Sequence, residues 1–374
     1  MILMVTGYIT RCQDYFWKAF SPCKGGLLFD RTTHSSCECL ALAANASYGL
    51  AALTSAWLQS SLRRMDLFQK VWPVKRGKAV AERQVGRCPA LDAAPNSTCI
   101  EGLRIAQDLK HACEKDELAL VFQPIVELRT GRIVEVEALL RWQHPRFGLL
   151  SPDSFIPIAE ETGAISEIGE WVIKCACKQL RAWRANLREA SELRMSINVS
   201  VVQLRDENFV ERALATIKRE GVAASSLTFE VTESKMMTQP DAMIARIAKL
   251  RSAGLRIAVD DFGIGYSSLI SVARMPLNTL KIDRDFTRRL GRSLRDDAVT
   301  RCMINLGQDL GLQVIAEGVE SLDHLSILHS LRCEYAQGYL FSRPLSADCF
   351  ERLLLQMPCF EDVIKAVYSE REAA

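Results

Sequence analysis

Side chains that could hold a metal ion recur at the ends of short apolar segments between residues 130 and 320. The segments lead into Glu137, Asn198, Glu230, Asp260, Asp261, Lys281 and Glu317. Burying so many carboxylates together costs on the order of several kcal/mol each unless a cation neutralises them. The set has oxygen donors and one amine but no Cys or His, which favours a hard cation such as Mg²⁺ or Mn²⁺ over zinc. Adjacent Asp260 and Asp261 could bridge two ions, an arrangement suited to phosphodiester hydrolysis.

The alternative is that each acid forms an ordinary ion pair with a neighbouring Lys or Arg at the end of a strand. That explains any one of these residues, but it does not explain a series in which successive strands end in a carboxylate, an amide or an amine. Such groups would meet if the strands were parallel, because the C-terminal ends of the strands in a (β/α)8 barrel converge on one mouth. We therefore expect one site.

The elements that must position these groups are short β-rich runs that alternate with amphipathic helices. Strands are predicted at 118–123, 133–139, 194–199, 227–231, 256–260, 279–282, 313–316 and 335–337. The segment 241–251 is typical of the intervening helices, with Pro240 before it and Gly254 after it. This alternation over roughly 250 residues predicts an α/β fold, a TIM-like (β/α)8 barrel. The turn at Thr130-Gly131 leaves hairpin spacing between the first two strands, so one strand should run antiparallel.

Composition sets broad limits on the class of protein. The chain has 374 residues, 48% apolar and 25% charged, which excludes collagen-like, disordered and small disulfide-scaffold proteins. A net charge of +2 gives no whole-molecule case for nucleic-acid binding. Residues 1–100 carry twelve basic and six acidic side chains, whereas the remainder is net acidic. We therefore predict an N-terminal extension at 1–100, a domain at 101–360 and a C-terminal tail at 361–374.

Two stretches of the extension stand out. Residues 40–58 are uncharged and rich in Ala, so they could form a membrane span or a helix that is buried or faces a partner. Basic Arg63 and Arg64 follow, which would place everything downstream in the cytoplasm. Residues 84–100 collect Gly, Pro, Asn and Ser and are predicted to be a linker. Thirteen cysteines, an odd number, without a secretory signal indicate a reducing compartment.

Eight sequence blocks between roughly residues 103 and 357 carry a family resemblance. They are FQPIVELRTG, EALLRW, SINVSVVQL, FEVTES, VDDFGIGYSSL, LKIDRDF, IAEGVE and QGYLFSRPL. In this order and at this spacing they resemble the EAL domain, the bacterial cyclic di-GMP phosphodiesterase family, whose naming tripeptide is Glu137-Ala138-Leu139 here. The resemblance implies metal-dependent hydrolysis of cyclic di-GMP to linear pGpG. It does not reach the first 100 residues, and the chain has no GGDEF-type cyclase motif.

The resemblance assigns roles to residues that match the family's motifs. Metal ligands fall on Glu137, Asn198, Glu230, Asp260, Asp261 and Glu317. The catalytic set is Lys281 with Glu137, Asp260 and Asp261. The substrate cleft would be lined by Gln123, Leu139, Arg141 and Gln337, with Arg141 as a phosphate clamp. A regulatory loop would comprise Glu233, Asp261, Phe262, Gly263 and Gly265. Position 264 is Ile, where the family commonly has a small or hydroxylated residue.

The same resemblance implies cofactors and partners. We expect two Mg²⁺ or Mn²⁺ ions in the site and inhibition by Ca²⁺, which is larger and accepts irregular coordination. We also expect a homodimer formed through the barrel, cyclic di-GMP as substrate and no direct nucleic-acid binding. The location should be cytoplasmic or, if residues 40–58 associate with a membrane, the inner membrane with the catalytic domain in the cytoplasm. The alternative function is a catalytically weak or inactive cyclic di-GMP receptor. Such receptors typically lack one or more of the metal-binding residues, whereas in this chain each of those positions holds a residue of the expected type.

Overall fold

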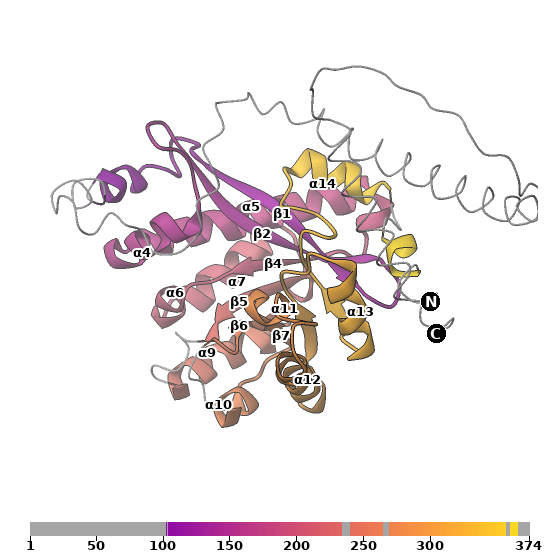
Figure 1. The fold of residues 1–374 in the computed structure, drawn as a ribbon. Helices are drawn as coiled ribbons and strands as arrows, with labels where there is room; N and C mark the ends of the chain where they lie inside the picture. The colour runs from indigo at the N-terminus through magenta and orange to yellow at the C-terminus, as the bar shows by residue number, and fades with distance from the viewer. Residues whose placement is uncertain (1–101, 103, 234–239, 265–268, 357–359, 366–374) are drawn as a thin grey trace, which may run out of the picture. The chain divides into compact units, whose positions relative to one another are not determined.

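The computed structural model describes residues 102, 104–233, 240–264, 269–356 and 360–365 (Figure 1). The predicted extension at 1–100, with its stretches at 40–58 and 84–100, lies outside the described residues, as do Gly265 and residues 366–374. Among the helices that the structure describes, none combines the length and the apolar character needed to cross a bilayer.

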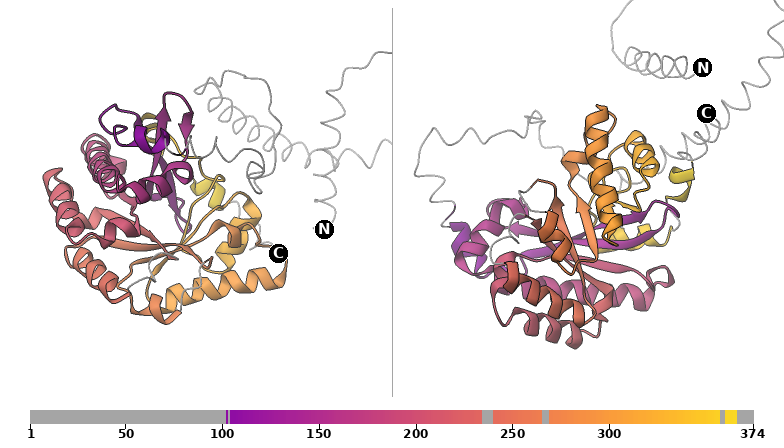
Figure 2. Two further views of the ribbon diagram at one scale, coloured as in Figure 1. Left: turned by 90° about the vertical axis from the view of Figure 1, so that its left-hand side faces the viewer. Right: turned by 90° about the horizontal axis from the view of Figure 1, so that it is seen from below.

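A single nine-stranded sheet forms the centre of the domain and closes on itself. Its strands are β1 Leu118–Glu127, β2 Ile133–His144, β3 Gly148–Leu150, β4 Arg194–Asn198, β5 Leu227–Thr232, β6 Arg256–Phe262, β7 Thr279–Ile282, β8 Gln313–Ala316 and β9 Tyr335–Ala336. The order is β1-β9-β8-β7-β6-β5-β4-β2-β3, and β1 also pairs with β2, which closes an eight-stranded barrel with β3 outside the ring. Helices surround the barrel (Figure 2). The predicted barrel is confirmed.

The first strand has the reversed direction that the hairpin spacing predicted. Strand β1 runs antiparallel to both β2 and β9, and all other neighbours within the ring are parallel. The pairing of β1 with β2 places Gln123 opposite Glu137. A predicted substrate-binding residue and a predicted metal ligand are therefore neighbours across one ladder.

The predicted ends of several strands were wrong. Strand β2 continues to His144 instead of stopping at residue 139, because it pairs with β1 as far as Trp142 and with β3 beyond that. Glu137 consequently lies in the middle of a strand. Strand β1 extends to Glu127, and the short strand β3 was not predicted. Strand β4 ends at Asn198 and β9 at Ala336, each one residue earlier than expected.

The helices follow the strands in the alternation that the sequence indicated. They are α4 Pro152–Thr162, α5 Ile165–Asn186, α6 Val201–Arg205, α7 Phe209–Arg219, α9 Pro240–Ser252, α10 Leu269–Arg274, α11 Arg284–Thr287, α12 Leu294–Asp309, α13 Leu322–Ser330 and α14 Ala347–Leu354, with 3-10 turns η2 Arg188–Ala190 and η3 Ala224–Ser226. Ser200 caps α6 by accepting from the Val202 N–H, and Gln203 accepts from the Ser200 N–H in return. The helix predicted at 241–251 is α9.

The structure buries side chains in two separate layers. The main hydrophobic core lies between the strands and the helices, and includes Trp183, Phe229 and Leu280. Phe360 and Ile364 also belong to this core, so the packed chain continues past residue 360. Inside the barrel the alternation of strand side chains places a second layer, which contains the buried apolar residues Ile125, Ala258 and Ile315 and the hydroxyl residues Ser196, Thr228 and Thr279.

Candidate active site

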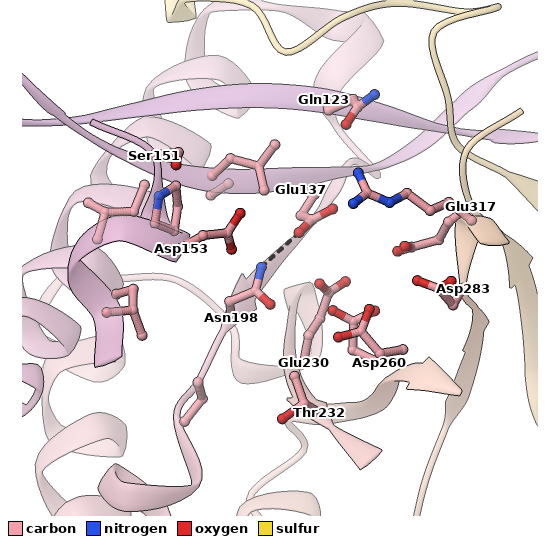
Figure 3. Close-up of a pocket in the computed structure, with 18 of the residues that line it drawn as sticks. Gln123, Glu137, Ser151, Asp153, Asn198, Glu230, Thr232, Asp260, Asp283 and Glu317 are labelled. Carbon is pink, nitrogen blue, oxygen red and sulfur yellow. Dashed lines mark hydrogen bonds between the residues drawn. The ribbon is translucent and has the colours of Figure 1, made fainter. Parts of the chain in front are cut away.

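A cleft of about 960 Å³ opens at the end of the barrel where the parallel strands finish. Polar residues of β1, β2, β4, β5 and β6 line it, together with groups that follow β7, β8 and β9 and the start of α4. Figure 3 shows Glu137, Asn198, Glu230, Asp260 and Glu317 pointing toward one another in the cleft. Residues spread over 180 positions of sequence therefore share one site.

Glu137 is fixed in position by two amides. Its Oε1 accepts a hydrogen bond of 2.7 Å from Asn198 Nδ2, and its Oε2 accepts one of 2.8 Å from Gln337 Nε2 (Figure 3 shows the first). Burial would raise the pKa of Glu137, but the charge of Lys281 and these two hydrogen bonds outweigh it, so the pKa is lowered. Glu137 therefore stays ionised.

Lys281 lies at the centre of the carboxylates and is 1% exposed. Its Nζ is 2.6 Å from Glu317 Oε1, 2.8 Å from Glu230 Oε2, 3.2 Å from Asp260 Oδ1 and 3.6 Å from Glu137 Oε2. Burial alone would lower the pKa of this amine, but the four carboxylates raise it well above its ordinary value. The single ammonium of Lys281 is thus shared by four carboxylates, which leaves the site with excess negative charge.

That excess appears as raised pKa values of carboxyl groups. Burial, reinforced by the charge of Glu137, raises the pKa of Glu230 well above its ordinary value. Burial likewise raises the pKa of Glu317 to about 8, although Lys281 opposes it. Burial and the charge of Asp260 raise the pKa of Asp261 to about 6. The arrangement favours additional positive charge at neutral pH.

Within the described residues, an acidic group of suitable size for a metal ion is formed by Asp260, Asp261 and Glu317, whose ligand oxygens lie within 4.8 Å of one another. Asp260 Oδ1 is buried and accepts no hydrogen bond, although Lys281 lies beside it. An all-oxygen donor set with a buried carboxylate oxygen that lacks a hydrogen bond fits a hard divalent cation. Glu137 and Glu230 are joined to this group through Lys281, and Asn198 is hydrogen-bonded to Glu137.

The four residues expected to bind substrate all line the cleft. Gln337 Nε2 also donates to Gln123 Oε1 at 3.2 Å, and Gln123 Nε2 donates to the carbonyl of Ser342 at 3.0 Å. Leu139 is half-buried beside them. Arg141 is half-buried and donates to the carbonyl of Leu140 at 2.7 Å. Burial lowers the pKa of its guanidinium.

The predicted regulatory loop begins at Asp261, a non-glycine residue with a φ of +55°. Glu233 Oε2 accepts a hydrogen bond of 2.7 Å from the backbone N–H of Gly263, so the end of β6 is tied to the end of β5. Gly263 has a φ of +104°, and a Cβ there would lie 2.5 Å from Met303 Cε and 2.7 Å from Phe286 Cε2. Only glycine fits this turn. Phe262 is buried in the main core, and Ile264 is exposed at the rim of the cleft.

Sequence reasoning missed several lining residues. Asp283 follows β7 directly, is 5% exposed and lies in the cleft beside Glu317 (Figure 3). Its Oδ1 also accepts from the Asp285 N–H that begins α11. Its place immediately after an apolar strand was a usable signal. Tyr339 lines the rim, with the Arg343 guanidinium 4.3 Å from its ring centroid, and nothing in the pattern singled it out. Ser151 and Asp153 contribute from the start of α4.

Comparison with known proteins gives a consistent result for this part of the chain. A model of the EAL domain family matches residues 106–344. Cyclic di-GMP phosphodiesterase NbdA of Pseudomonas aeruginosa is 40% identical over 252 residues, which are 67% of this chain and 32% of that protein. The bifunctional diguanylate cyclase/cyclic di-GMP phosphodiesterase MucR of the same species is 38% identical over 257 residues, 69% of this chain and 37% of that protein.

Solved structures agree in fold. The PaMucR phosphodiesterase in complex with c-di-GMP superimposes with a TM-score of 0.63 at 38% identity, covering 66% of this chain and 99% of that one. The chain spans about a third of the length of the two curated relatives named above.

Proposed function

Because this chain belongs to the EAL domain family, we propose that it hydrolyses cyclic di-GMP to linear pGpG with the help of divalent cations. The observation that carries the proposal is the buried ring of Glu137, Glu230, Asp260 and Glu317 around one lysine. Four carboxylates at this density need more positive charge than Lys281 supplies. The open cleft above them is large enough for a dinucleotide.

The residues that would hold two Mg²⁺ or Mn²⁺ ions are Glu137, Asn198, Glu230, Asp260, Asp261 and Glu317. Bound there, the ions would supply a water molecule of lowered pKa and stabilise charge on the phosphate that is attacked. Asn198 and Gln337 support this role by holding Glu137 as a carboxylate through bonds of 2.7 and 2.8 Å. We expect Ca²⁺ to bind and to inhibit, since it accepts longer and less regular coordination.

Lys281 acts as a fixed cation that is already oriented before the reaction. Its ammonium is buried and hydrogen-bonded to Glu230, so it is held without the freedom of a surface lysine. A charge placed in this way stabilises a developing negative charge without reorganisation during the reaction. Arg141 is suited to a phosphate oxygen because its guanidinium is half-buried at the cleft. Gln123, Gln337 and Leu139 would position the rest of the substrate.

Loop, assembly and location complete the proposal. The tie between Glu233 and the Gly263 N–H supports a role of the loop in setting the position of Asp261. The family resemblance supports a homodimer formed through the barrel. A cytoplasmic location is proposed from the cysteine content, and residues 40–58 remain the proposed point of any membrane association. Nucleic-acid binding is not proposed, because the net charge of +2 is close to balance.

The alternative function is a receptor that binds cyclic di-GMP without turnover. A purified full chain, stripped of metal, separates the two when it is incubated with cyclic di-GMP and Mg²⁺, Mn²⁺ or Ca²⁺. Chromatography of the nucleotides should show pGpG with the first two ions and none with Ca²⁺. Glu137→Ala should abolish turnover, while the exposed control Glu207→Ala should match the parent. Calorimetric binding without product in any ion would establish the receptor instead, and absence of both would overturn either function.

A further inference from the structure

The connection from β4 to α6 carries one of the expected metal-binding residues. Asn198 ends β4, α6 begins at Val201, and only Val199 and Ser200 lie between them. Asn198 Nδ2 donates to Glu137 Oε1, which leaves Oδ1 as the atom of this amide that can bind a cation (Figure 3). The side chain of Asn198 is exposed to the cleft, so packing does not fix it. Its place therefore depends on the backbone of the connection.

Hydrogen bonds hold this backbone to the sheet and to its own helix. The Val199 N–H donates to the carbonyl of Glu230 at 2.9 Å, and the Ser200 N–H donates to Gln203 Oε1 at 3.0 Å. Gln203 is 3% exposed and packs against Gly169, where a Cβ would collide with the Gln203 amide. These bonds fix the connection relative to β5 and α6, but neither of them reaches α4.

Glu160 on α4 supplies the attachment from that side. Ser200 Oγ donates its proton to Glu160 Oε1 at 2.6 Å, and a hydrogen bond to a carboxylate is stronger than one between neutral groups. Glu160 is half-buried at the wall of the cleft, near the end of the helix whose start brings Ser151 and Asp153 to the same cleft. Glu160 therefore joins this wall to the connection that carries Asn198.

We propose that Glu160 is a positioning residue for the metal site. By holding the Ser200 hydroxyl, Glu160 sets where Asn198 Oδ1 lies relative to Glu137 and Glu230. The inference rests on the proposed function in one respect, namely that Asn198 binds a divalent cation. Polar partners that orient the metal-binding side chains of a site typically change metal affinity by about 10–100-fold when they are lost.

Mn²⁺ binding by the full chain without substrate tests this role. Paramagnetic resonance of free Mn²⁺ measures the affinity. Glu160→Met removes the acceptor at similar side-chain length and leaves the cap of α6 intact, so it should weaken Mn²⁺ binding about tenfold. Glu160→Gln keeps an acceptor oxygen and should restore most of the affinity. The matched control is Glu161→Met, at the exposed neighbouring position, which should bind Mn²⁺ like the parent.

Two further measurements separate positioning from other roles. Ser200→Ala should also weaken Mn²⁺ binding, and adding Glu160→Met to it should weaken binding little further, because both changes act through one hydrogen bond. Turnover of cyclic di-GMP by Glu160→Met should be low when Mn²⁺ is limiting. Saturating Mn²⁺ should restore kcat with KM close to that of the parent.

The outcomes distinguish this role from the hydrolysis itself. Equal Mn²⁺ affinities of the parent and Glu160→Met overturn the role. A raised KM at saturating Mn²⁺ also overturns it, because Glu160 would then contact the substrate. A parent that does not bind Mn²⁺ overturns it together with the metal site. If the parent binds Mn²⁺ but forms no pGpG, the proposed hydrolysis falls, and the comparison of Mn²⁺ affinities still decides the role of Glu160.

Discussion

The two ends of the same barrel hold an inward-facing cation in different circumstances. At the cleft end, Lys281 has four carboxylates within 3.6 Å of its amine, and its pKa is raised despite complete burial. At the opposite end, burial and then the charge of Arg194 lower the pKa of Arg256, although Glu135 opposes them. Both residues face inward on adjacent strands of one sheet. Lys281 is the more deeply buried of the two, so the rise of its pKa comes from the four carboxylates around it.

The comparison shows that the barrel determines where inward-facing side chains lie, but not which charges they carry. Each end gathers side chains from several strands. At the cleft end four carboxylates share one ammonium, so the residues there do not cancel their own negative charge. At the opposite end Glu127 and Glu135 balance Arg194 and Arg256. A cleft with surplus carboxylates is suited to divalent ions.

Replacing the cation at the cleft end should have the largest effect. Lys281→Met removes the charge that four carboxylates share, so turnover should fall at least about 100-fold. Loss of one partner of a buried ion pair should also destabilise the metal-free protein by about 3–5 kcal/mol. Kinetic assays and chemical denaturation measure the two effects. Lys249→Met is the control, because that lysine is 67% exposed. An unaltered metal-free stability would contradict the central role given to this ammonium.

A change at the end of the barrel opposite the cleft should affect stability alone. Arg194→Gln leaves Glu135, which is 3% exposed, without its partner, and should cost about 1–3 kcal/mol. Turnover per folded molecule should stay at the parental value, because neither side chain is hydrogen-bonded to a described residue of the cleft. Denaturant unfolding and steady-state kinetics on the same preparation separate the effects. A collapse of turnover with unchanged stability would break the distinction between the two ends.

The pH dependence of stability should reveal the surplus carboxylates. Glu317 has a pKa of about 8 in the folded protein against 4.5 as its ordinary value, and Glu230 is raised as well. Between these values the folded state binds more protons than the unfolded state, so stability of the metal-free protein should fall as pH rises from 4.5 to 8. The unfolding midpoint should therefore be lower at pH 8 than at pH 5.

Added Mg²⁺ or Mn²⁺ should reverse that trend. Protons compete with the ions for Glu317 and Glu230 at pH 5 but much less at pH 8, so the midpoint should rise more at pH 8. Glu317→Gln removes one raised carboxyl group and should flatten the metal-free profile. Equal metal effects at both pH values would show that protons and ions do not compete for these groups.

The smallest effect is expected at the exposed rim. Arg288 pairs with Glu320 at 2.9 Å, and both side chains are about two fifths exposed. Arg288→Gln should change stability by less than about 1 kcal/mol. It should lower kcat/KM modestly for a dianionic substrate, and more so at low salt, because a rim cation steers an anion toward the cleft. A salt series of kcat/KM checks this. A salt-independent deficit would indicate direct contact instead.

The sequence predicted the architecture well where one signal dominated. Strands β7 and β8 were placed to the residue, since each is a short apolar run with polar neighbours. The convergence of Glu137, Asn198 and Glu230 followed from parallel strands. The full length of β2 could not be predicted, because it depends on pairing with β1 and β3, which the pattern of β2 alone does not show.

Other features depended on three-dimensional register. Arg194, Arg256 and Gln313 look like polar flanks of strands in the sequence, and only the ladders show that they face inward beside Thr228. Asp283 was overlooked because an aspartate that begins a short helix is usually a cap, and it is one here while also lining the cleft. The roles assigned to the site residues through the family resemblance remain predictions for the experiments above.

The reversed direction of β1 has a practical consequence for engineering. In an all-parallel barrel β1 would begin at the end opposite the cleft, but Leu118 pairs with Trp142, beyond Glu137 on the cleft side. Strand β1 therefore begins on the side of the cleft. A fluorescent reporter or light-responsive module inserted directly before this strand would be attached on the side of the cleft.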